Sequence, residues 1–147
     1  FFAFPVVLCM IVGSLIGGWA ADRWGHKALV QSSILAIALA IAVLVAADLN
    51  TSGIALMAAA APIYLALGSL TASSYALFMD LTDPAIGGTQ FSAFMGATNL
   101  CEVWSIALAG AIVSKTDYPI AFGCAAAISL IALPLVPFAR RAHTLPK

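Results

Sequence analysis

Charged side chains are scarce in this sequence. Lysine, arginine, aspartate and glutamate make up 8% of its 147 residues, whereas hydrophobic residues make up 63%. About a quarter of the residues of an average soluble domain are charged, because water covers its surface. We therefore exclude an ordinary water-soluble domain and expect a lipid bilayer to surround most of the chain. The formal net charge is zero, so no basic field indicates a nucleic-acid partner.

Cysteine and histidine are also few and scattered. Cys9, Cys101 and Cys124 lie in apolar runs, without the paired spacing of a disulfide framework or a metal site. A small buried hydrophobe is the simplest role for each of them. His26 and His143 lie in polar segments outside the apolar runs, and the sequence has no Walker loop. We therefore expect no metal, no cofactor and no enzymatic activity.

Five long apolar runs account for most of the chain. A helix needs about 20 apolar residues to cross the roughly 30 Å hydrocarbon core of a bilayer. The runs are continuously apolar rather than alternating, which favours helices over a β-barrel. The third run is longer than a perpendicular crossing requires, and tilt or a bend at Pro62 would absorb the excess. The predicted spans cover residues 1–21, 28–47, 53–79, 91–113 and 119–139.

Positive charges gather on one side of the predicted membrane. Five crossings place the first loop, the third loop and the tail, residues 140–147, on the same side. That side holds Arg23, Lys27, Arg140, Arg141 and Lys147, whereas the opposite side has only Lys115. By the positive-inside rule the arginine-rich side is cytoplasmic, and the N-terminal end of the sequence lies outside.

The first loop contains a motif. Residues 17–27 read Gly-Gly-Trp-Ala-Ala-Asp-Arg-Trp-Gly-His-Lys. This string resembles the signature loop of the major facilitator superfamily, G-x-L-a-D-r-x-G-r-k, although Ala20 replaces the usual leucine and His26 a usual basic residue. A generic basic turn between two spans is the alternative. The residues that match the signature are Gly18, Asp22, Arg23, Gly25 and Lys27.

The glycines around this loop suggest close packing and a tight turn. Gly25 permits backbone torsions that a side chain would oppose. Gly13 and Gly17 are spaced as a small-x-x-x-small pair, continued by Ser14 and Gly18, so a neighbouring helix could approach closely.

The charged residues of the loop suggest a gate. Asp22 ends its own helix, where the helix dipole is unfavourable to an anion, but it would suit the N-terminus of another helix. We expect Arg23 and Lys27 to pair with nearby acidic groups. Such a cluster can form in one conformational state and break in another.

The resemblance also implies a place in a larger fold. In the superfamily the signature loop follows the second helix and, in a more degenerate form, the eighth. Only three predicted spans follow the loop here, and the sequence opens at Phe1 rather than methionine. We therefore expect a fragment comprising helices eight to twelve, part of the C-terminal six-helix bundle. The partner helix of Asp22 would then belong to the missing N-terminal half.

The third loop, residues 79–91, is rich in turn-forming residues. Asp83-Pro84 and Gly87-Gly88 are turn signals, and Thr89 is a candidate N-cap for the fourth span. The string 83–89, with Asn99-Leu100, resembles acetyl-CoA transporters, and residues 89–91 are similar to muropeptide permeases. Both groups belong to the peptide–acetyl-CoA–drug branch of the superfamily. A turn, a cap and a helix is the plainer interpretation.

The fourth predicted span contains an acidic residue, Glu102, about midway along it. A charged side chain at the bilayer centre costs about 2.5–3.5 kcal/mol even on insertion scales, so it must contact protein or water, or carry a proton. Thr98, Asn99 and Ser105 share its helix face. We expect Glu102 to bind a substrate group or a coupling proton. The alternative is a structural hydrogen bond to a neighbouring helix.

The third predicted span presents a second polar face. Thr71 and Tyr75 recur there at helical spacing. Hydroxyls in membrane helices often bond back to their own helix, so Tyr75, with an aromatic face and a polar tip, is the better candidate for lining a cavity. The tryptophans Trp19 and Trp24 are predicted anchors at the membrane interface.

Together these features predict an all-α integral membrane protein with five transmembrane helices. We expect a secondary active transporter, working by alternating access and coupled to protons, in the inner membrane of a bacterium. Its solute would be a small organic molecule, with muropeptide-like and acyl-CoA-like compounds implied by resemblance alone. A non-transporting sensor or scaffold with the same fold, or an unrelated five-span protein, is the alternative.

Overall fold

The computed structural model describes residues 3–46 and 53–139, and all regular structure within those ranges is helical. The first four helices are each long and apolar enough to cross a membrane, and the fifth reaches that length together with the short 3-10 helix that follows it. The prediction of five transmembrane helices is therefore confirmed. The predicted span ends at Phe1 and Ala47 and the predicted basic tail, residues 140–147, lie outside the described residues. The elements are α1 Ala3–Trp24, α2 His26–Ala46, α3 Gly53–Leu81, α4 Gly87–Val113, α5 Tyr118–Ala132 and the 3-10 helix η1 Leu133–Phe138.

The first two helices are separated by a single residue, Gly25. Its φ of 91° lies in the left-handed region, which costs glycine little and other residues more. The Gly25 amide donates to the Ala21 carbonyl at 2.9 Å, while its own carbonyl accepts from Leu29 at 3.2 Å. The tight turn expected at Gly25 is present, and α1 continues beyond Ala21 to include residues 17–24 of the signature motif.

Helices α1 and α3 pack with their backbones close together. A Cβ on Gly17 would come within 2.5 Å of the Ser69 Cα, and one on Gly13 would collide with the backbone of Leu65. Ser14 adds a hydrogen bond from its hydroxyl to the Gly68 carbonyl at 3.1 Å. Small residues and interhelical hydrogen bonds are what hold membrane helices together, because lipid gives them no hydrophobic reason to associate.

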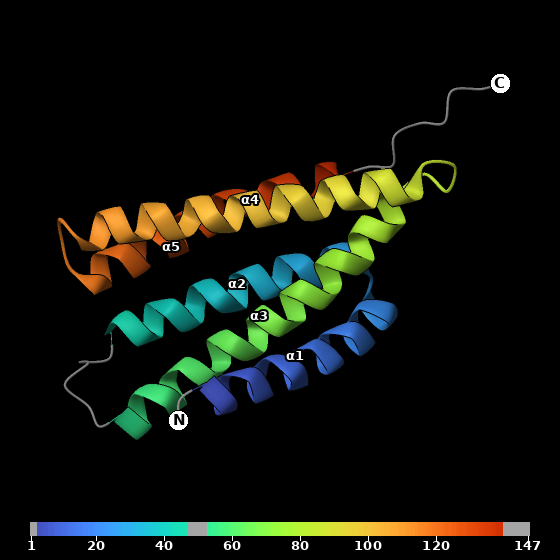
Figure 1. Cartoon of the computed structure of the whole chain (residues 1–147). Coiled ribbons are helices and arrows are strands. Elements are labelled where there is room, and N and C mark those ends of the chain that lie inside the picture. The colour runs from blue at the N-terminus through green and yellow to red at the C-terminus, as the bar shows by residue number, and fades with distance from the viewer. Residues whose placement is uncertain (1–2, 47–52, 140–147) are drawn as a thin grey trace.

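Helix α2 occupies the middle of the bundle, packing against α3 on one side and α5 on the other (Figure 1). It contributes the largest share of the buried residues, including Ile37 and Ile41. The buried hydroxyl of Ser33 lies 3.1 Å from that of Ser69, which gives each polar group a partner across the interface.

The fifth span does not end as a regular α-helix. The α-helical part stops at Ala132, and residues 133–138 form η1. Pro134 and Pro137 cause this change, since proline has no amide proton for the i to i−4 bond. Pro137 leaves the Leu133 carbonyl without its α-helical donor, and the Gln31 side chain of α2 donates to that carbonyl at 3.3 Å.

Helix α4 lies apart from α1 and α2. It contacts α3 and α5 and has no buried residue in the part of the chain that the structure describes. Near the third loop, Phe78 of α3 and Phe94 of α4 stack with ring centroids 5.1 Å apart. From that loop the two helices diverge along their length (Figure 1).

Candidate functional site

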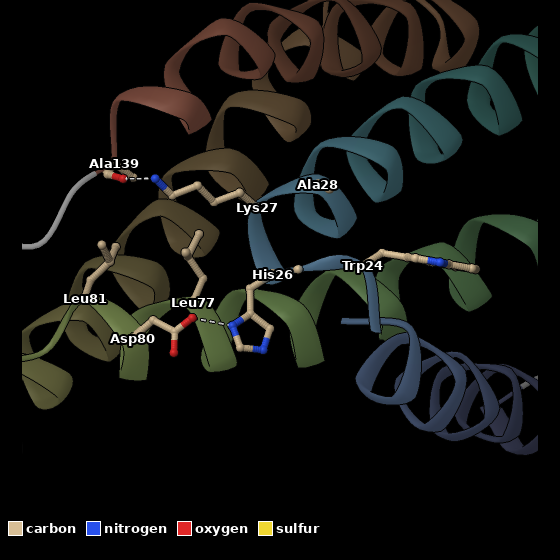
Figure 2. Close-up of a pocket in the computed structure, with 9 residues that line it drawn as sticks. Trp24, His26, Lys27, Ala28, Leu77, Asp80, Leu81 and Ala139 are labelled. Carbon is tan, nitrogen blue, oxygen red and sulfur yellow. Dashed lines mark hydrogen bonds and ion pairs between the residues drawn. The ribbon is translucent and has the colours of Figure 1, made fainter. Parts of the chain in front are cut away.

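The first loop, the end of α3 and the end of η1 meet at one end of the bundle. The turn between α4 and α5 lies at the opposite end (Figure 1). An open pocket of about 500 Å³ separates the three segments at the first end (Figure 2). It is lined by Trp24, Gly25, His26, Lys27, Ala28, Leu77, Asp80, Leu81 and Ala139.

His26, the first residue of α2, connects the first loop to α3. Its Nδ1–H donates to Oδ2 of Asp80, in the last turn of α3 (Figure 2). Its other ring nitrogen, Nε2, lies 3.8 Å from Oδ1 of Asp22 on α1. The imidazole therefore touches carboxylates from two neighbouring helices.

The two basic residues of the signature loop bind groups other than those expected. Within residues 3–46 and 53–139 neither Arg23 nor Lys27 forms an ion pair with an acid. The Arg23 guanidinium lies 5.8 Å from the ring centroid of Trp19, within cation–π range. Lys27 donates from Nζ to the Ala139 carbonyl, just after η1 (Figure 2). A carbonyl at a helix C-terminus attracts a cation, so Lys27 ties α2 to the end of the last span.

Asp22 and Gly18, which also match the signature, have few contacts. The Asp22 side chain is 84% exposed, and among the described residues its charged neighbour is His26. A Cβ on Gly18 would meet no atom within 4 Å, so Gly18 takes no part in the close packing with α3 that Gly13 and Gly17 make. The expected continuation of that packing through Gly18 is therefore wrong for this bundle.

The third loop folds around Asp83 and Pro84. The Ile86 amide donates to the Asp83 carbonyl at 3.1 Å, which closes a turn with proline at its second position. The Asp83 side chain accepts from the Ala85 amide at 2.9 Å. In addition, the Asp83 amide donates to Oε1 of Gln90 at 2.7 Å, so the first turn of α4 reaches back to the loop.

The structure differs from the expectation for the rest of this loop. Helix α4 begins at Gly87, with Ile86 at the N-cap position and no side-chain cap. Gly87 and Gly88 are thus helical rather than part of the turn, and Thr89 lies too far inside the helix to be its N-cap. The turn closes at Ile86, before the glycines, because Asp83 and Pro84 already supply its geometry.

The candidate coupling residues on α4 lie on an exposed helix. Thr98, Asn99 and Glu102 are all exposed in the described structure. The Thr98 hydroxyl donates to the Phe94 carbonyl of its own helix at 2.9 Å. Among the described residues the side chains of Glu102 and Asn99 have no hydrogen-bond partner, so neither side chain is satisfied within the five spans.

The candidate residues on α3 are half-buried and lie nearer the third loop. Thr71 bonds back to the Leu67 carbonyl at 2.9 Å, and the Tyr75 ring lies 6.5 Å from that of Phe78. Because α3 and α4 diverge from the loop, the described contacts do not join Tyr75 to Glu102. The polar faces of α3 and α4 remain two separate features of the bundle.

Near the helix ends, four residues that bind across elements were not singled out as site residues from the sequence: His26, Asp80, Gln31 and Gln90. One signal was available for the first two. The first loop is basic, the third loop is acidic, and both are expected on the same side of the membrane. The two glutamines gave no such signal. Each one bonds to a backbone group, and the sequence does not indicate which backbone group a side chain will meet.

The fold and this site define a membrane-embedded helical bundle with a signature loop at one end. Comparison with known families agrees, because the family model described as Major Facilitator Superfamily matches residues 2–147. The chain belongs to the major facilitator superfamily, a family of membrane transporters. No curated protein and no solved structure gives a significant match to the chain.

Proposed function

We propose that the chain is part of a secondary active transporter that works by alternating access and uses a proton gradient. The observation that carries the proposal is the pairing of two features: a signature loop with an exposed Asp22 at one end of the bundle, and Glu102 midway along an exposed, otherwise largely apolar helix. The first suits a gate and the second suits a site for a proton or a solute.

Glu102 supports proton coupling through its position. It lies in the middle of the 27-residue helix α4, which spans about 40 Å at 1.5 Å per residue. An ionised carboxylate facing lipid at that depth is costly, so Glu102 must face a polar partner, face water or carry a proton. A carboxyl group that exchanges a proton as its surroundings alternate between the two sides supplies the coupling.

The proposal assigns α1 to α5 to helices eight to twelve of a twelve-helix protein. The departures of the loop from the full signature, Ala20 for leucine and His26 for a basic residue, support this assignment, because the copy after the eighth helix is the more degenerate one. The exposed face of α4 would then meet the N-terminal half across the solute site, as transporters built from repeats place it near the midplane. The end of the bundle with the signature loop is cytoplasmic, and the membrane is a bacterial inner membrane.

The solute is a small organic molecule in this proposal. The third loop, from Asp83 to Thr89, resembles those of acetyl-CoA transporters and muropeptide permeases. Both kinds of solute are polar organic anions, which makes a muropeptide and acetyl-CoA the first probes to use.

The test is uptake by the full-length protein in proteoliposomes. Radiolabelled muropeptide and acetyl-CoA are offered separately, with and without an inward proton gradient. We expect one of them to accumulate, and Glu102→Gln to reduce gradient-driven accumulation by at least about tenfold, since an amide cannot carry the proton. Solute exchange without net proton movement should persist.

Ser92→Ala is the matched control, because Ser92 is an exposed residue of the same helix, distant from Glu102. It should leave accumulation unchanged. Accumulation by Glu102→Gln with an unchanged pH dependence would exclude the proton role. Movement of neither probe would show that the solute class is wrong.

A further inference from the structure

One imidazole at the signature loop lies between two carboxylates from different helices. The His26 side chain is 21% exposed, whereas those of Asp22 and Asp80 are 84% and 58% exposed. Asp80 belongs to α3, Asp22 to α1 and His26 to α2, so this cluster joins the first three spans at one end of the bundle. Figure 2 shows the contact between His26 and Asp80.

The two contacts of His26 differ in what they require. A carboxylate only accepts hydrogen bonds, so the bond to Asp80 places a proton on Nδ1. In the neutral ring the other nitrogen, Nε2, then carries a lone pair, which offers nothing to Asp22 3.8 Å away. In the imidazolium both nitrogens carry protons, and Nε2–H can donate to Asp22. The contact with Asp80 exists in both forms, whereas the attraction to Asp22 exists only in the charged form.

The other charged groups near His26 are engaged elsewhere. Arg23 on α1 lies over Trp19, and Lys27 on α2 donates to the Ala139 carbonyl. The groups that face the imidazole in the described structure are therefore Asp22 from α1 and Asp80 from α3. Imidazole is the side chain that changes charge between about pH 5 and 8, which arginine and lysine do not.

We propose that His26 is a proton-dependent positioning residue of the gate. Its imidazolium holds Asp22 against α2, and its neutral form releases Asp22 to bind the N-terminus of a helix beyond this bundle. The inference rests on the proposed function, because it regulates the signature loop that the proposed gate uses. It gives the loop a response to pH that is separate from any proton carried by Glu102.

The test measures the loop without any solute. A nitroxide spin label is placed at Trp24→Cys, the exposed last residue of α1, in full-length protein that lacks its native cysteines and is held in nanodiscs. The electron paramagnetic resonance spectrum is recorded at about pH 5.5 and about pH 8, either side of the range where imidazole titrates. We expect the immobile fraction of the label to fall by about twofold or more as the pH rises.

Three variants, each in the spin-labelled protein, identify the group that causes the pH-dependent change in mobility. His26→Arg keeps a permanent cation, so the label should stay immobile at both pH values. His26→Gln can still donate to one carboxylate but cannot become charged, so the label should be mobile at both. Asp22→Asn keeps His26 and Asp80 intact and should also abolish the change. A pH-dependent change that survives in His26→Gln or Asp22→Asn would overturn the proposal.

A second readout separates this inference from the proposed function. Absence of uptake of both probes would contradict the proposed solute class while leaving the spin-label result unaffected. Conversely, if the label at position 24 is equally mobile at both pH values in protein that keeps His26, the proposed role of His26 would be overturned, even if uptake is robust.

Discussion

At the scale of single residues, the polar side chains near the loops bind backbone groups more often than they bind one another. Lys27 binds the Ala139 carbonyl, Gln31 binds that of Leu133, and Gln90 accepts from the Asp83 amide. In each case the partner is a backbone group that proline or a helix end leaves without a helical bond. Formal charge alone predicts acidic partners for Arg23 and Lys27, and it misses these bonds because every residue offers the same backbone groups.

The start of α4 gives the first test at this scale. Gln90→Ala removes the acceptor of the half-buried Asp83 amide and should lower the free energy of unfolding by about 1 kcal/mol. Thr89→Ala is the matched control, since Thr89 is exposed and is not the N-cap. It should change stability by no more than about 0.5 kcal/mol. Unfolding in a detergent titration, followed by circular dichroism, measures both.

A loss of stability in Thr89→Ala that equals or exceeds the loss in Gln90→Ala would contradict this account. It would show instead that α4 is capped by the threonine hydroxyl, as the sequence alone suggested.

At the scale of helices, the contact of α1 with α3 depends on the absence of side chains. Gly13, Gly17 and Gly68 let the two backbones approach, and Ser14 then reaches a carbonyl of the neighbouring helix. Neighbouring glycines of α1 therefore differ in importance, because only those on the α3 side meet another backbone.

Gly17 and Gly18 make a matched pair for this contact. Gly17→Ala places a Cβ within 2.5 Å of the Ser69 backbone, and we expect a loss of about 1–3 kcal/mol from overpacking. Gly18→Ala meets open space, and alanine favours helix over glycine by up to about 1 kcal/mol, so stability should hold or rise slightly. The same detergent titration compares them. Equal destabilisation by both variants would contradict the close α1–α3 contact.

The presence of the five long helices could be predicted from the sequence. Apolar runs of about 20 residues must be helical in lipid, because each backbone polar group needs a partner inside its own segment. Helix ends were less predictable. The end of α5 depends on Pro134 and Pro137, and the start of α4 depends on a turn that Asp83 and Pro84 close early.

The candidate site could be predicted only in part, because some of its features are local in sequence and others are not. The signature loop is a local pattern, so its residues and its glycine turn could be identified without a structure. The contact between His26 and Asp80 joins residues 54 positions apart, and no local pattern indicates which acid the imidazole meets.

At the scale of the whole molecule, the bundle is closed on one side and open on the other. Helices α1, α2 and α3 pack tightly around small residues, while α4 contacts only α3 and α5 among the described helices and exposes Asn99 and Glu102. An apolar groove of about 710 Å³ between α4 and α5, lined in part by Trp104, adds to this open side. Polar groups exposed at membrane depth need protein or water, which the proposed solute cavity and second half would supply.

Alternating access is the central claim, and access to α4 from the two sides of the membrane tests it most directly. A single cysteine at Ser105→Cys, on the face of Glu102, is offered to a membrane-impermeant thiol reagent from either side of the full-length protein, after removal of native cysteines. We predict labelling from both sides, and a change of at least about tenfold in the inside-to-outside ratio in Asp22→Asn, equivalent to about 1.4 kcal/mol. Asp117→Asn, at the opposite end of the bundle, should leave the ratio unchanged. Labelling from one side alone, or the same ratio in Asp22→Asn as in the wild type, would contradict the account.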